Sequence, residues 1–170
     1  MNDLIINKGT VQAHLQVAEG VDKQEFRRFI FEAQYIDLKE ILCDTFYFDL
    51  VGNYADDKYE TLLNGGIYTY EGDTYHFEGL EKVLSYFTYG RFLVESPIQS
   101  TSFGVTRKNA EDSERVSLRE LEALGQKHYD RALTVFKGVE QFLDRNTEIY
   151  TLWKNVTCKT NIETKIELWG

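Results

Sequence analysis

Residues 23–51 contain neither glycine nor proline, and their pattern constrains the fold more than any other stretch of the chain. Their apolar side chains recur mostly at intervals of three and four, which is the spacing of an amphipathic helix. A single helix over this range would be roughly 40 Å long at a rise of 1.5 Å per residue, and Asp22 is placed to cap its first turn. The main apolar stripe consists of Phe26, Phe29, Ile30, Ala33, Leu38, Ile41, Leu42 and Phe46.

A second apolar stripe runs along the same predicted helix through Phe31, Tyr35 and Phe48. A helix that is apolar on more than one side must be covered on more than one side. Two explanations remain open: the helix is central within the monomer, or its second side forms a contact between subunits.

Two more long helices are predicted in the second half of the chain. Residues 80–95 have helical apolar spacing and end before Pro97, the only proline of the chain, which cannot continue a helix. Residues 117–146 form the other helix, which Ser117 and Glu120 can open as a capping box.

Shorter elements fill the first half of the chain. We expect one short helix near residues 10–18, capped by Thr10, and another over 56–63. Tyrosine and phenylalanine alternate with smaller or polar residues in 67–79 around the turn Glu71-Gly72-Asp73. That alternation predicts a β-hairpin.

Residues 161–170 alternate in a different way, which predicts a strand at the C-terminus. A single strand leaves its N–H and C=O groups unpaired unless it joins an edge. We expect this strand to pair with the hairpin at 67–78 or with a strand of another subunit. The pairing residues are Ile162, Ile166, Leu168 and Trp169.

These patterns predict a mainly α protein. The architecture is a helical bundle with long central helices, a small β-hairpin and a C-terminal β-strand. Residues 1–160 form the helical domain, with the hairpin near 67–78, and residues 161–170 form a C-terminal strand or arm.

Composition excludes several classes of protein. The formal net charge of −9 argues against a protein that grips DNA through a basic face, because neutralising phosphates requires Lys and Arg. Cys43 and Cys158 form no CxxC pair, so neither a disulfide scaffold nor a cysteine zinc site is expected. Cys43 is expected to be a small core residue, and no apolar run is long enough to span a membrane.

The motifs of common catalytic sites are missing from the sequence. The three histidines, His14, His76 and His128, are far apart along the chain. His128 falls on the apolar face of the last helix, where a histidine is more often part of a core or an interface than of a catalytic site. We therefore expect no catalytic residue, no metal site and no cofactor.

Gln34 and Asp37 fall close to the main apolar face of residues 23–51. A polar group buried there costs free energy unless it is paired. Either these side chains form hydrogen bonds to a loop or a neighbouring helix and fix its register, or they lie at the edge of the apolar face and are hydrated. Both explanations stay open.

Residues 96–113 form a long polar excursion between two good helices. Connections in compact domains are usually about 4–6 residues, and longer ones tend to be functional or disordered. Ser102-Phe103-Gly104-Val105 places two apolar residues inside it, and Arg107-Lys108 follows. We predict that these six residues bind another chain, with Phe103 as the anchor.

Four segments in this order resemble head-to-tail connector (adaptor) proteins of tailed bacteriophages, in particular the set found in crAss-like and related phages. They are the helix with EAQYIDL followed by IL, the aromatic helix that ends near Pro97, the SFGV segment with its charged follow-on, and the last long helix with HYDRA. The resemblance covers roughly residues 4–152. The order and spacing of the segments carry it.

The resemblance implies a structural virion protein with no enzymatic activity. Such proteins form a ring, usually of twelve copies, beneath the portal at the capsid vertex. DNA passes through the ring without sequence-specific binding, and tail or neck proteins attach to it. The protein would be assembled in the host cytoplasm and reside in the neck of the virion, with no membrane contact.

Two alternatives to a connector ring remain. One is another neck or tail-completion protein with the same physical properties at another position. The other belongs to a different class: a small helical enzyme or regulator whose site residues meet only in the fold.

Overall fold

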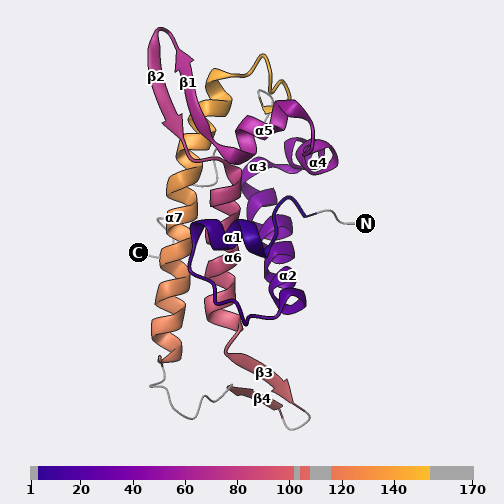
Figure 1. The fold of residues 1–170 in the computed structure, drawn as a ribbon, viewed down its shortest axis with the longest axis vertical. Coiled ribbons are helices and arrows are strands. Elements are labelled where there is room, and N and C mark those ends of the chain that lie inside the picture. The colour runs from indigo at the N-terminus through magenta and orange to yellow at the C-terminus, as the bar shows by residue number, and fades with distance from the viewer. Residues whose placement is uncertain (1–3, 102–103, 108–115, 154–170) are drawn as a thin grey trace.

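The computed structural model describes residues 4–101, 104–107 and 116–153, and their fold is mainly α, as predicted (Figure 1). The C-terminal strand expected over 161–170 lies outside the described residues. The elements are α1 (Lys8–His14), α2 (Lys23–Glu32), the π-helix η1 (Ala33–Leu38), α3 (Lys39–Leu42), α4 (Asp44–Asn53), α5 (Asp57–Asn64), β1 (Gly66–Tyr70), β2 (Asp73–Phe77), α6 (Leu80–Glu95), β3 (Ile98–Thr101), β4 (Gly104–Arg107) and α7 (Leu118–Arg145).

Helix α6 is the centre of the bundle. It runs alongside α7 on one side, while α1, α2 and η1 pack on the other (Figure 1). The two hairpins lie at opposite ends of the long axis, β1–β2 at one end and β3–β4 at the other. No helix in the described ranges is long and apolar enough to cross a membrane.

Local end signals account for several helix boundaries. Ser117 and Glu120 form the predicted capping box at the start of α7, and the Asp22 carboxylate accepts the N–H of Glu25 at the start of α2. The cap of α1 is Asn7 instead of the expected Thr10, which sits at the third helical position and completes a capping box. Helix α6 has the predicted bounds.

The single helix predicted over 23–51 is wrong. The chain turns at Cys43, whose φ of 61° and ψ of 158° end α3 and start α4 in a new direction. The turn lets α4 bury Phe46 against an aromatic cluster in which the Trp153 ring lies 5.5 Å away between centroids. Tertiary packing thus overrides helix propensity at a position that carries neither glycine nor proline.

Cys43 also differs from its expected role. It is half-buried rather than a core residue, and it is disulfide-bonded. Cys158, the only other cysteine of the chain, lies outside the described residues.

The hairpin predicted over 67–79 is confirmed as β1–β2. Its strands pair from Gly66 opposite Phe77 to Tyr70 opposite Asp73. The two turn residues have positive φ, 51° at Glu71 and 90° at Gly72, as a tight two-residue hairpin turn requires.

The polar excursion after α6 is more ordered than the sequence suggested. It contains a second antiparallel hairpin, in which Ile98 pairs with Arg107 and Thr101 with Gly104. No strand was predicted at residues 98–101 and 104–107, so this hairpin is an element that sequence reasoning missed.

Helices α6 and α7 come into close contact at Gly90 and Gly125. A Cβ atom on Gly125 would lie 2.5 Å from Val94 Cγ2 and 3.2 Å from the Gly90 carbonyl oxygen. The absence of side chains at this crossing therefore allows the two backbones to touch.

Alanine at Gly125 should destabilise the protein, whereas alanine at Gly138 in the same helix should stabilise it. Both changes gain helix propensity of about 1 kcal/mol, but the first adds overpacking that costs about 1–3 kcal/mol. A Cβ at Gly138 would meet only Phe77 Cβ, at an ordinary 3.7 Å. Urea unfolding of the two variants checks this, and shifts of the same sign would contradict it.

Candidate functional site

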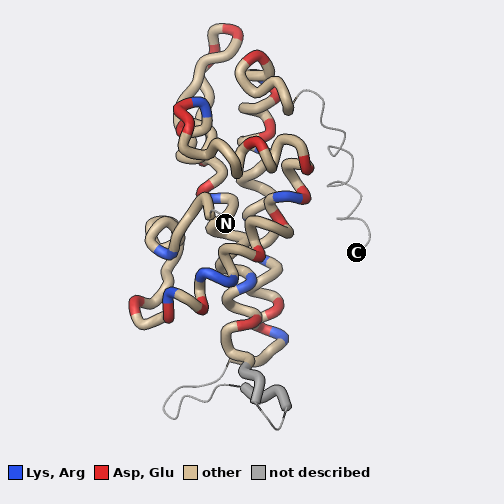
Figure 2. Tube along the Cα trace, turned by 90° about the vertical axis from the view of Figure 1, so that its right-hand side faces the viewer, with Lys and Arg blue, Asp and Glu red and all other residues tan. Residues whose placement is uncertain are grey.

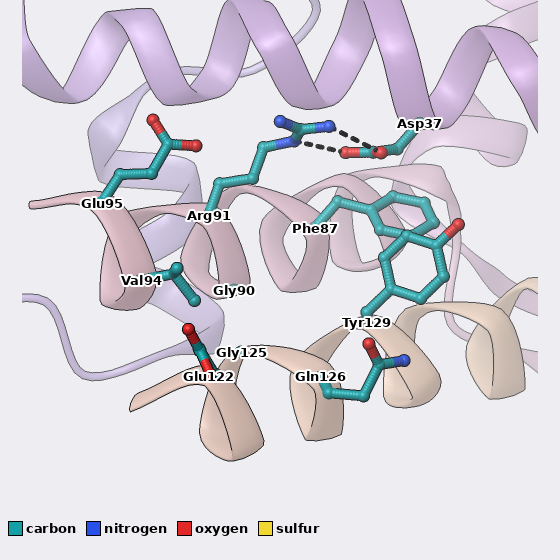
Figure 3. Close-up of a pocket in the computed structure, with 10 residues that line it drawn as sticks. All are labelled: Asp37, Phe87, Gly90, Arg91, Val94, Glu95, Glu122, Gly125, Gln126 and Tyr129. Carbon is teal, nitrogen blue, oxygen red and sulfur yellow. Dashed lines mark hydrogen bonds and ion pairs between the residues drawn. The ribbon is translucent and has the colours of Figure 1, made fainter. Parts of the chain in front are cut away.

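The buried ion pair between Asp37 and Arg91 is the most distinctive polar feature of the described bundle (Figure 3). Arg91 Nε donates to Asp37 Oδ2 at 2.7 Å, and Arg91 Nη2 donates to Oδ1 at 2.9 Å. The exposed fraction is 8% for the Asp37 side chain and 24% for Arg91. This two-point geometry is the strong form of a carboxylate–guanidinium contact.

The π-helix positions the polar side chains that enter the core. The Lys39 N–H reaches back five residues to the Gln34 carbonyl, and such wide turns often mark functional sites. Both Gln34 and Asp37 are buried in this turn. The Gln34 Oε1 accepts the backbone N–H of Ile5 at 2.8 Å, so it fastens the N-terminal segment to η1.

Of the two explanations left open for Gln34 and Asp37, the structure shows bonding across to other elements. Gln34 reaches the N-terminal segment and Asp37 reaches α6. Sequence reasoning did not identify Arg91, the partner of Asp37. The available signal was a lone arginine within the aromatic helix 80–95.

Further charged side chains lie next to this ion pair and form additional ion pairs. Arg91 Nη1 lies 3.6 Å from Glu32 Oε2, and Arg28 bridges Glu32 at 3.7 Å and Glu95 at 3.3 Å. The hydrogen bonds that Arg91 donates to Asp37 raise the pKa of Arg91 against the opposing effect of burial. Arg91 therefore stays charged and does not exchange protons near neutral pH.

An open groove of about 350 Å³ lies between α6 and α7 beside this pair (Figure 3). Besides Asp37 and Arg91, its wall includes Glu95 from α6 and Glu122 and Gln126 from α7. Three carboxylates and one guanidinium give the groove a negative balance, which suits a cationic group better than an anion. The carboxylate–guanidinium pair is already satisfied internally, so it braces η1 against α6.

The three histidines lie on three different elements, α1, β2 and α7. His128 is buried, its ring 5.8 Å from that of Tyr86 and 4.9 Å from that of Tyr89. Its Nδ1 has no hydrogen-bond partner among the described residues. In the described ranges, no three His, Cys, Asp or Glu side chains cluster as metal ligands.

Acid should destabilise the protein through His128. Burial, together with the charges of Arg131 and Lys127, lowers the pKa of His128 below 6.5. The unfolded chain then binds the proton more readily, so stability present above about pH 6.5 is lost as the pH falls towards the folded pKa. Between about pH 7 and pH 5.5, the free energy of unfolding should depend less on pH in His128→Gln than in the wild type. His76→Gln, at an exposed position, is the control; equal slopes in all three proteins would contradict the expectation.

The predicted partner-binding residues fall partly within the described chain. Gly104, Val105 and Arg107 belong to β4, at the end of the bundle away from β1–β2 (Figure 1). Ser102, Phe103 and Lys108 lie outside the described residues, as do the C-terminal residues Ile162, Ile166, Leu168 and Trp169.

Comparison with known proteins gives one match. The model of a family described as "Family of unknown function (DUF6712)" matches residues 38–162. No curated protein and no solved structure matches the chain significantly. The family match begins at the last residue of η1 and includes Arg91, both hairpins and the part of the groove that α6 and α7 form, while Asp37 lies one residue before it. The chain therefore belongs to the DUF6712 family.

Proposed function

We propose that the protein is the subunit of a head-to-tail connector ring, placed beneath the portal of a tailed bacteriophage. The observation that carries this proposal is the β3–β4 hairpin at one end of an elongated bundle, opposite β1–β2 (Figure 1). An isolated two-stranded hairpin is marginally stable in water, and its strand edges can pair with another chain. A hairpin at each end of the bundle suits a subunit that binds one protein at one end and a different protein at the other.

The charge of the chain supports a channel through which DNA passes. Asp and Glu residues occur along the bundle from one end to the other (Figure 2), and the formal net charge is −9. Such a surface repels phosphates, so DNA can move past it without being held.

Ring closure requires two different complementary faces on each subunit, related by a rotation. The resemblance described above implies twelve copies, with the portal protein on one side and tail or neck proteins on the other. The protein would then reside in the neck of the virion and have no enzymatic activity.

Substitutions within residues 102–108, in and next to β4, test this function. Phe103→Ala should weaken association with a cognate portal protein by roughly 1–3 kcal/mol at every salt concentration, as the loss of one buried aromatic anchor does. Replacing Arg107 and Lys108 with Glu should weaken association mainly at low salt, since exposed charges are screened over about 10 Å at 0.1 M.

The matched control reverses the same amount of charge elsewhere. Lys127 and Arg131 are exposed on α7, so Lys127→Glu with Arg131→Glu should leave portal association unchanged. If the hairpin variants associate as tightly as the wild type, the hairpin is not the docking element.

A different neck or tail-completion protein would have the same physical properties. The two positions are separated by which purified neighbour, portal or tail protein, binds the hairpin end. The third alternative, a small enzyme or regulator, has the groove beside Arg91 as its candidate site. There the Asp37 carboxylate and the Arg91 guanidinium already bind each other, which favours a structural role.

A further inference from the structure

An exposed aromatic face, defined here as Phe31, Tyr35, Lys39 and Phe48, extends over α2, η1, α3 and α4. The exposed fractions of the three rings are 36%, 46% and 53% in chain order. Phe31 and Tyr35 stack with centroids 5.7 Å apart and planes 4° from parallel. The Lys39 Nζ lies 5.1 Å from the centre of the Tyr35 ring and 5.2 Å from that of Phe48.

This face is the second apolar stripe of the sequence, and the described part of the chain leaves it uncovered. Preorganised aromatic surface of this kind marks a site of interaction. Aromatic residues contribute large hydrophobic area and anchor interfaces. An occupant of this stripe must therefore come from outside the described residues of the chain.

The described chain ends near the turn between α3 and α4. Trp153 is buried and its ring lies 5.5 Å from that of Phe46 in α4, and Phe46 lies in the first turn after Cys43. Only residues 154–157 separate Trp153 from Cys158, a stretch that spans at most roughly 17 Å when extended. Cys158 can therefore reach the disulfide-bonded Cys43.

We propose that the aromatic face is covered by residues 159–170 of the same chain, tethered by a disulfide between Cys43 and Cys158. Cys43 follows Lys39 by one helical turn, so the tether delivers the segment to one end of the face. From Cys43 back to Phe31 the helical rise is roughly 18 Å. An extended segment from Cys158 to the C-terminus is longer than that.

The chemistry of the segment fits the face. In an extended segment Ile162, Ile166 and Leu168 lie on the same side and supply apolar side chains for the rings. An extended chain at the surface can satisfy its remaining N–H and C=O groups with water. A hairpin edge is therefore not required as its partner.

The tether also favours this occupant over a second copy of the chain. An intramolecular link gives the segment an effective concentration in the millimolar range, above that of a free subunit in dilute solution. Forming the bond from two thiols releases two protons and two electrons, which a low-molecular-weight disulfide accepts by exchange. The inference does not depend on the proposed ring.

Two measurements on the full-length protein test the proposal. Peptide mapping without reduction should find Cys43 linked to Cys158 within one chain. Hydroxyl-radical footprinting should label Tyr35 and Phe48 several-fold less than Tyr70, a hairpin residue with an exposed fraction of 36%. In Cys158→Ser, labelling of Tyr35 and Phe48 should rise several-fold while that of Tyr70 stays constant.

A second variant separates the covering segment from its tether. Ile166→Asp with Leu168→Asp retains both cysteines and should uncover the face to the same extent. A Cys43–Cys43 link between two chains, or protection that depends on protein concentration and persists in Cys158→Ser, would identify a second copy as the occupant and overturn the proposal. Unprotected rings in the oxidised wild type would also overturn it.

Discussion

Asp37→Ala is expected to lower the free energy of unfolding by about 2–4 kcal/mol, because it leaves the Arg91 guanidinium without its buried partner. The pair is held by two hydrogen bonds of 2.7 and 2.9 Å. Some water still reaches Arg91, which keeps the cost below that of a fully buried charge. Denaturant unfolding measures the loss.

Two comparisons make this expectation specific. Arg28→Ala, which removes the exposed pair with Glu95, should cost less than about 1 kcal/mol. Replacing both members, Asp37→Leu with Arg91→Met, should recover much of the loss, since no buried charge then remains unpaired. If Asp37→Ala costs no more than Arg28→Ala, the pair does not brace η1 against α6.

Trp153→Ala is expected to cost about 3–5 kcal/mol, the range for removing a large aromatic side chain from a core. The indole is 1% exposed, packs edge-on against Phe46 and Phe136, and donates its Nε1–H to Asp144 Oδ1 at 2.8 Å. Its loss would open a cavity where α4 meets the end of α7. The thermal unfolding midpoint should fall accordingly.

The neighbouring position provides the control for Trp153. Leu152 is exposed, and Leu152→Ala should change stability by less than about 0.5 kcal/mol. The stability of Trp153→Phe should lie between those of the two alanine variants. It keeps the packing of an aromatic ring but loses the hydrogen bond that the indole donates to Asp144. Equal effects of Trp153→Ala and Leu152→Ala would show that the aromatic cluster does not hold the C-terminal end of the described chain.

The parts of the fold that were predictable are those that a few adjacent residues determine. The capping box of Ser117 and Glu120, the turn at Glu71-Gly72 and the stop before Pro97 each depend on a few adjacent residues. Each satisfies backbone groups or sets backbone angles without help from distant segments. Sequence reasoning therefore identified α6, α7 and β1–β2.

The misplaced elements depend on distant contacts. The turn at Cys43 exists because Phe46 is buried against Tyr59, Tyr150 and Trp153, none of which is close in sequence. The β3–β4 hairpin was missed because its strands are largely polar and show no alternation of apolar residues. Its available signal was the β-branched content of Thr101, Val105 and Thr106.

The candidate site was predictable in part for the same reason. The position of Asp37 on an apolar face showed that it needs a partner. The partner itself, Arg91, is 54 residues away. The five-residue turn of η1 that aims both Gln34 and Asp37 inward also has no sequence pattern that distinguishes it from an α-helix.

The mass of the purified protein in its native state, alone and mixed with a cognate portal protein, tests the ring most directly. The account predicts a closed oligomer in at least one of these samples, with a mass that is an integral multiple of the single chain and twelve copies as the expected number. A single-chain mass in both samples, at concentrations where the portal itself is assembled, would contradict the connector function.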